Sequence, residues 1–151
     1  MIETEVVKSE IQHSVDDCSA LIAIKILGRK WIPWIICELL EENNLYFSDL
    51  LKRIEGTYGR KISARVLSEC LSRLEENGIL RREVLGGTMP IRVRYSLTEK
   101  GIDFQVIFAV LKGWGFKWGS VRQKKCRSFH CIHNSVPVID IDKASSLLDA
   151  P

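Results

Sequence analysis

Apolar side chains in this chain recur first at helical spacing and then at strand spacing. Up to residue 77 they return every three or four positions, and capping residues and turns divide this stretch into several helices. Over residues 80–97 the period becomes two, which predicts a β-hairpin, and a last helix follows from residue 98. The pattern predicts, in order, helix 14–28, helix 31–42, a short strand at 45–47, helix 49–55, helix 63–77, hairpin 80–97 and helix 98–118.

The fourth helix and the hairpin have the clearest boundaries. Ser63 is a capping residue, and the Asn-Gly pair at 77–78 is a strong signal for the end of a helix. In the second arm of the hairpin, apolar and polar residues alternate over 91–97, which places Arg92 and Arg94 on one outer face.

This order of elements predicts the fold class. Three short helices followed by a two-stranded hairpin describe a winged helix-turn-helix, mainly α with a small β-hairpin (α+β). In that module one helix enters the major groove of duplex DNA, while the hairpin lies along the adjacent groove or backbone. We therefore predict a flexible arm at 1–13, a winged-helix domain at 14–118 and a C-terminal extension at 119–151.

Length and composition agree with one globular domain. The chain has 151 residues, of which 46% are hydrophobic and 27% charged, and this balance excludes a disordered or low-complexity protein. No apolar run approaches the ~18 residues of a membrane span. The acidic start does not resemble a signal peptide. We therefore expect a cytoplasmic protein without a membrane partner.

The net charge of +3 is unevenly distributed. Residues 112–127 contain six Lys and Arg and no Asp or Glu, which is typical either of contact with an anionic partner or of a solvated basic surface. The charge by itself leaves both interpretations open.

The polar face of helix 63–77 is the candidate DNA-reading surface. Its exposed positions follow the spacing i, i+3, i+4 and i+7, and Arg65 is the side chain best suited to guanine. Acidic residues at 69 and 76 count against tight docking, and a merely solvated face is the alternative. The predicted DNA-contacting residues are Lys30, Arg60, Lys61, Ser63, Arg65, Ser68, Ser72, Arg92 and Arg94, with the bases outside the helix assigned to phosphates.

Several segments resemble one family. Gly28-Arg-Lys-Trp31, Ser63-Ala-Arg-Val-Leu67, the segment 74–82 and above all the block 90–101 are similar to the landmarks of HxlR-type regulators, a subgroup of the MarR-like transcriptional regulators. The resemblance covers roughly residues 18–118.

The resemblance implies a small homodimeric winged-helix regulator that binds double-stranded DNA. Its first and last helices would supply the dimer contact, with Trp114 or Trp118 as anchors. Some family members sense oxidants through a cysteine just before the first helix, and Cys18 matches that position. The alternative for Cys18 is an ordinary thiol near the dimer contact.

The chain has five cysteines, and the odd number argues against a disulfide framework. Four potential soft ligands lie close together in the extension: Cys126, His130, Cys131 and His133. Their spacing does not match common structural zinc sites, so we expect no metal or other cofactor and keep zinc as an open option. The neighbouring bases favour the thiolate of Cys126, which makes that residue a redox candidate.

The leading hypothesis is a homodimeric, sequence-specific DNA-binding regulator. The alternative is a winged-helix protein-interaction or architectural module without sequence-specific binding. An enzyme is not expected, because the chain has no Ser/His/Asp order, no Gly-rich phosphate loop and no carboxylate pair. No residue pattern identifies an effector or an operator.

Overall fold

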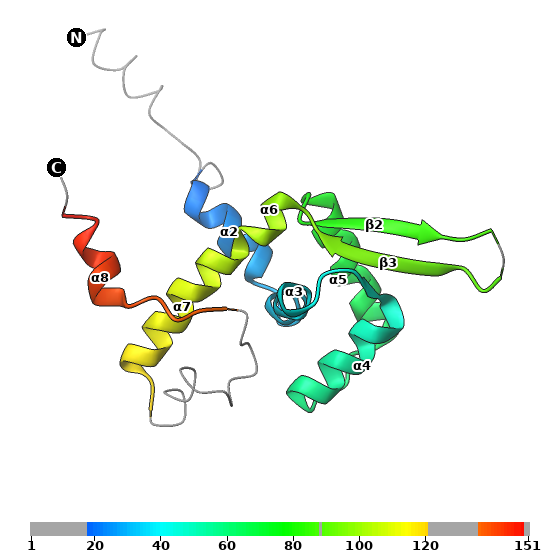
Figure 1. Ribbon diagram of the computed structural model, residues 1–151, viewed down its shortest axis with the longest axis horizontal. Coiled ribbons are helices and arrows are strands. Elements are labelled where there is room, and N and C mark those ends of the chain that lie inside the picture. The colour runs from blue at the N-terminus through cyan, green and yellow to red at the C-terminus, as the bar shows by residue number, and fades with distance from the viewer. Residues whose placement is uncertain (1–17, 88, 121–135, 150–151) are drawn as a thin grey trace, which may run out of the picture.

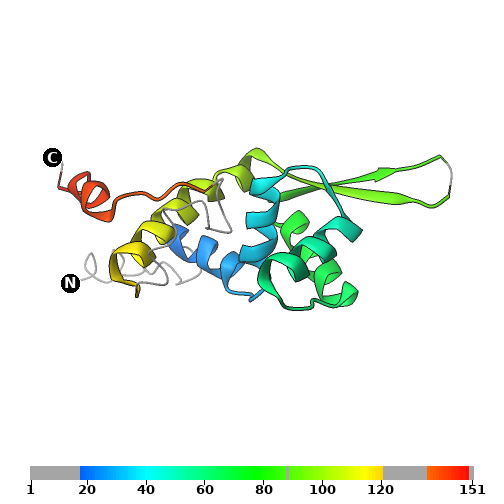
Figure 2. The same ribbon diagram turned by 60° about the horizontal axis from the view of Figure 1, so that its bottom comes forward.

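The protein is described by a computed structural model over residues 18–87, 89–120 and 136–149. Helices and a small sheet form the body, from which one long hairpin projects (Figures 1 and 2). The elements in chain order are α2 (Ser19–Leu27), α3 (Ile32–Glu41), β1 (Leu45–Tyr46), α4 (Phe47–Tyr58), α5 (Ala64–Glu76), β2 (Leu80–Leu85), β3 (Arg92–Leu97), α6 (Glu99–Ile102), α7 (Phe104–Trp118) and α8 (Ile141–Ser146).

The sheet has three antiparallel strands in the order β1-β3-β2. The hairpin register runs from the pair Leu80 and Leu97 at its base to the pair Leu85 and Arg92 near its tip. Strand β1 pairs only with the base of β3, where Leu45 lies opposite Tyr95. The inner half of the hairpin is therefore attached to the body, and its outer half extends into solvent as a wing.

Ten aliphatic side chains with less than 2% exposure form the centre of the core. They come from α3, α4, α5 and the start of the hairpin: Ile32, Ile35, Ile36, Leu39, Leu50, Ile54, Leu67, Leu71, Leu74 and Ile79. Each such side chain contributes about 1.5–3 kcal/mol by leaving water. The three helices of the predicted winged helix-turn-helix are thus held as one packed unit, and the predicted fold class is confirmed.

Helix α4 is longer than the predicted helix 49–55 at both ends. It begins at Phe47, directly after β1, and continues to Tyr58. The residue that caps its C-terminal end is Gly59, whose φ of +63° lies in the left-handed region that glycine adopts without strain. The added turn stacks the Tyr58 ring on Trp34 of α3, with ring centroids 4.2 Å apart. Because Trp34 and Tyr58 belong to different helices, the spacing of residues within the α4 segment could not predict this contact or the added turn.

One further prediction needed correction. The single helix predicted over 98–118 is divided at Asp103 into α6 and α7, after a start capped by the Thr98 hydroxyl. The extension contains the short helix α8, which is capped by Asp140, because the Asp140 carboxylate accepts hydrogen bonds from the N–H groups of residues 142 and 143. The first helix is described only from Ser19 onward, so its predicted start at 14 lies outside the described residues.

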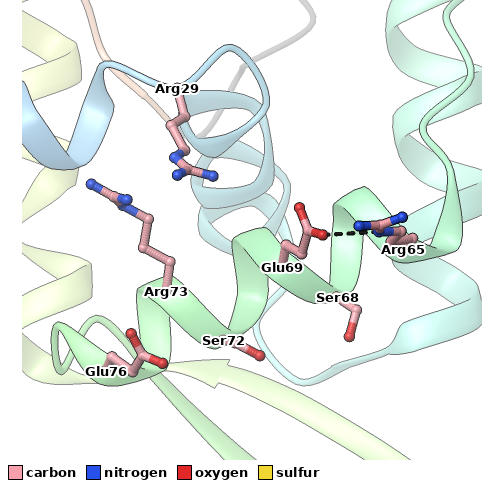
Figure 3. A pocket seen from close by; sticks show the side chains of 7 residues that line it. All are labelled: Arg29, Arg65, Ser68, Glu69, Ser72, Arg73 and Glu76. Carbon is pink, nitrogen blue, oxygen red and sulfur yellow. Dashed lines mark hydrogen bonds and ion pairs between the residues drawn. The ribbon is translucent and has the colours of Figure 1, made fainter.

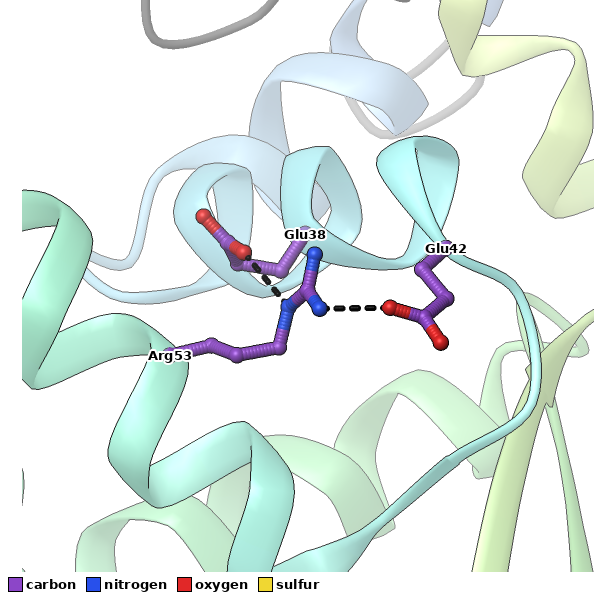
Figure 4. Close-up of polar contacts among 3 residues, drawn as sticks. All are labelled: Glu38, Glu42 and Arg53. Atoms are coloured by element: carbon purple, nitrogen blue, oxygen red, sulfur yellow. Dashed lines mark hydrogen bonds and ion pairs between the residues drawn. The ribbon is translucent and has the colours of Figure 1, made fainter.

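A buried carboxylate joins α3 to α4 (Figure 4). Glu38 is only 3% exposed and accepts a hydrogen bond from Arg53 Nε at 3.1 Å. Arg53 also pairs with Glu42 at 2.5 Å, so one guanidinium contacts both α3 and the residue that caps its C-terminal end. Burial is the largest cause that raises the pKa of Tyr58, and the neighbouring Cys37 and Glu38 raise it further. The Tyr58 side chain also forms a hydrogen bond with Glu38. These contacts determine how α4 sits on α3.

We expect Arg53→Met to lower the free energy of unfolding by about 1–3 kcal/mol, because it leaves the buried Glu38 carboxylate without its charged donor. Urea unfolding followed by circular dichroism measures the change. Lys52→Met is the matched control, because it removes the same charge from an exposed neighbour on α4. Equal losses in the two variants would contradict this account.

The described part of the extension packs along α7 (Figure 1). Lys112 Nζ donates to the Val136 carbonyl at 2.8 Å, and the Ile139 N–H donates to the Ala109 carbonyl at 3.2 Å. At Gly113, a Cβ atom would lie 1.8 Å from the Ile139 carbonyl oxygen. The backbone of the extension therefore approaches α7 at a distance that only glycine permits.

Gly113→Ala should displace segment 136–149 from α7, because the added methyl group overlaps the Ile139 backbone. Hydrogen exchange across 136–149 should rise sharply. Gly115→Ala is the control on the same helix: its Cβ meets nothing within 4 Å, and we expect a gain of up to about 1 kcal/mol from helix propensity. Unchanged protection in the Gly113 variant would refute the docking.

None of the helices in the described ranges combines the length and apolar character that crossing a membrane requires.

Candidate nucleic-acid interface

Helix α5 presents a polar face to solvent because its apolar face is fully used by the core. The Ser63 hydroxyl caps the helix by accepting a hydrogen bond from the Val66 N–H at 3.2 Å. The side chains of Leu67, Leu71 and Leu74 are buried. The opposite face, which carries the predicted recognition residues, is exposed.

A shallow concavity of about 540 Å³ runs along this exposed face (Figure 3). Its lining residues are Arg29, Arg65, Ser68, Glu69, Ser72, Arg73 and Glu76. Arg65 is 88% exposed and pairs with Glu69 at 3.1 Å. Because exposed pairs of this kind contribute little to stability, Arg65 can exchange its partner for a base edge at small cost.

The other predicted bases surround α5 less closely. Arg60 and Lys61 are exposed just before the helix, and Lys61 lies 3.9 Å from Glu55. Lys30 lies over the Trp31 ring, with its Nζ 4.9 Å from the ring centroid. Three cationic side chains thus lie in loops next to the core helices, where a long side chain can follow a phosphate backbone.

The wing arginines share one face of the hairpin, as the alternation predicts, but both already have partners. Arg94 pairs with Glu83 across the two strands at 2.5 Å, and this hydrogen-bonded ion pair raises the pKa of Arg94. The Arg92 guanidinium lies over the Tyr46 ring, 4.0 Å from its centroid. Contact with DNA by either side chain therefore competes with an interaction inside the protein.

Arg29 and Arg73 line the same concavity and were not among the predicted contacts. Arg73 follows Glu69 by four positions on α5, a spacing that could have placed it on this face. Arg29 belongs to the loop between α2 and α3, which only the tertiary structure brings to α5. Burial raises the pKa of the Cys70 thiol, and the nearby charges of Arg29 and Arg73 oppose that shift.

The sequence predicts redox or metal-binding roles for several cysteine and histidine residues. Cys126, His130, Cys131 and His133 all lie outside the described residues. Within the described ranges, no group of three or more His, Cys, Asp or Glu side chains is arranged to hold a metal ion. Cys18 is exposed at the N-terminal end of α2. A redox role for Cys18 or Cys126 stays a prediction, as does zinc binding.

Comparison with known families decides the relationship. Residues 26–123 match the HxlR-like helix-turn-helix family. The chain belongs to this family. The resemblance proposed from the sequence motifs is therefore confirmed, and the protein is a DNA-binding transcriptional regulator of the HxlR type rather than an enzyme.

Individual relatives agree with this assignment. An HTH-type transcriptional regulator of Methanothermobacter thermautotrophicus is 38% identical over 68% of this chain and 73% of its own length. The Bacillus subtilis HTH-type transcriptional regulator YodB is 36% identical over 61% of this chain and 76% of its own length.

Solved structures support the winged-helix fold of this HxlR-type chain. The reduced form of YodB has a TM-score of 0.58 at 32% identity, covering 68% of this chain and 95% of the YodB chain. The reduced form of the redox regulator HypR has a TM-score of 0.59 at 26% identity, covering 71% of this chain and 99% of its own.

Proposed function

We propose that this HxlR-type regulator acts in the cytoplasm as a homodimer that binds a specific pseudo-palindromic DNA site. The observation that carries the proposal is the exposed polar face of α5, which stands beside a projecting wing. In this arrangement α5 enters the major groove and the wing follows the adjacent backbone. Arg65, Ser68 and Ser72 face the bases.

The homodimer is supported by apolar side chains that remain in solvent on α2 and α7, at the end of the molecule away from the wing (Figure 1). Trp114 is 60% exposed and Trp118 is 66% exposed. Further exposed apolar residues on these helices are Ile22, Ile24, Val106, Val110 and Leu111. Association with a second copy removes this surface from water, and two-fold symmetry makes the contact self-complementary.

The dimer also explains how a small protein could obtain specificity. Two copies of α5 related by a two-fold axis would contact successive major grooves about 34 Å apart. Phosphate contacts by Lys30, Arg60, Lys61 and the wing arginines would add affinity that falls as salt rises. A redox input through Cys18 remains a prediction, consistent with its exposure and with the description of the related HypR as a redox regulator.

Arg65→Ala should reduce discrimination between a selected duplex and a mismatched one by about 10- to 100-fold, because it removes a base contact. Arg94→Ala should instead weaken all duplexes and reduce the slope of log affinity against log salt. Fluorescence anisotropy with labelled duplexes obtained by in vitro selection measures both effects.

Glu69→Ala is the control for Arg65, because it breaks the same ion pair and retains the arginine. It should retain the sequence preference. If the unmodified protein bound every duplex equally, the sequence-specific assignment would fail and an architectural role would replace it.

Trp114→Glu should convert the dimer to a 17.2 kDa monomer and weaken binding to a two-half-site duplex far more than to a single half-site. The exposed position allows the monomer to fold with the new charge. Sedimentation velocity measures the mass, and Met89→Glu at the wing tip, far from α7, is the control for the effect of an added surface charge on the mass alone. A Trp114→Glu protein with unchanged mass would exclude α7 from the dimer contact.

A further inference from the structure

Two guanidinium groups converge at one end of the concavity on α5. Arg29 reaches down from the loop between α2 and α3, and Arg73 reaches up from the third turn of α5 toward it (Figure 3). Both side chains line the same hollow, although 44 positions separate them in the chain.

Within the described residues, neither arginine has a carboxylate within the 4.0 Å that defines an ion pair. Glu69 lines the same hollow but is paired with Arg65 at 3.1 Å (Figure 3). Glu76 also lines the concavity, and it makes no ion pair with another described residue. In the part of the chain that the structure describes, no acidic side chain therefore neutralises the convergence of Arg29 and Arg73.

Arg73 carries a second sign of an absent partner. Its Nε is buried and has no hydrogen-bond acceptor. A buried donor without an acceptor costs about 1–3 kcal/mol, and more when the group is charged. Like charges that converge also repel each other. An anion placed between the two guanidinium groups would relieve both costs.

We propose that Arg29 and Arg73 bind one backbone phosphate of the DNA duplex, forming a phosphate clamp at the side of α5. The clamp rests on the proposed function, because it requires α5 to enter the major groove. Guanidinium groups match phosphate oxygens with paired, charge-assisted hydrogen bonds. A helix in the major groove is flanked by the phosphates of the groove walls, and contacts to them set its register without reading sequence.

The two arginines thus differ in task from the residues beside them. Arg65, Ser68 and Ser72 present groups that discriminate between bases, whereas the clamp holds α5 at one depth and angle. Because the Arg29 loop leads directly into α3, the clamp ties the backbone of the DNA to the central helix of the core.

The test measures binding of the full-length protein to a random-sequence 30-base-pair duplex and to the selected duplex between 50 and 300 mM KCl. Arg29→Gln and Arg73→Gln should each weaken binding to both duplexes by about tenfold at the same salt. Because both side chains hold one phosphate, the double variant should lose less than the product of the single losses. In the double variant, the slope of log affinity against log salt should become less negative by about 0.9 per protomer.

Lys143→Gln is the matched control, because it removes the same charge from exposed α8, which lies away from α5 (Figure 1). It should leave affinity and slope unchanged. Arg73→Lys keeps the charge without the planar fork, so it should recover the salt slope and only part of the affinity. Arg29 is exposed, so its variants keep the test valid if Arg73→Gln is found to unfold.

Binding by the double variant with the affinity and slope of Lys143→Gln would overturn the clamp while leaving the proposed function intact. Losses in the two single variants that multiply fully would show two separate contacts and would also overturn it. Failure of the unmodified protein to bind either duplex at 50 mM KCl would instead overturn the proposed function and the clamp with it.

Discussion

The burial of one face of α5 is the constraint on which the rest of the molecule depends. Leu67, Leu71 and Leu74 pack into a core built by α3 and α4, so the helix cannot rotate without exposing them. Its polar face is therefore held outward as a consequence of apolar packing. The packing of the core that stabilises the fold therefore also orients the face of α5 that we propose reads DNA.

Polar contacts refine this orientation. Arg53 joins the buried Glu38 to α4, and the Trp34 and Tyr58 rings stack where α3 and α4 come together. Removing any of these contacts would leave the helices packed but free to shift. A base contact requires a side chain to reach specific atoms of the base. A small shift of α4 would also displace α5, and the side chains of α5 would then be misplaced relative to the bases.

Most of the cations near the interface are already partnered. Arg65 pairs with Glu69, and Arg94 pairs with Glu83, whereas Arg29 and Arg73 have no carboxylate partner within the described residues. A side chain that must give up an internal partner contributes less net affinity than its charge suggests. The electrostatic part of binding should therefore depend on where a cation lies in the fold more than on how many cations the sequence contains.

The sequence by itself determined the order of elements, helix α5 with its Ser63 cap, and the alternation of the wing, because these depend on periodicity and on local capping chemistry. The family followed from short motifs that lie within those same elements. Tertiary structure decided the length of α4, the docking of the extension at Gly113 and the meeting of Arg29 with Arg73. Each of these brings together residues far apart in the chain, and no local pattern carries information about such contacts.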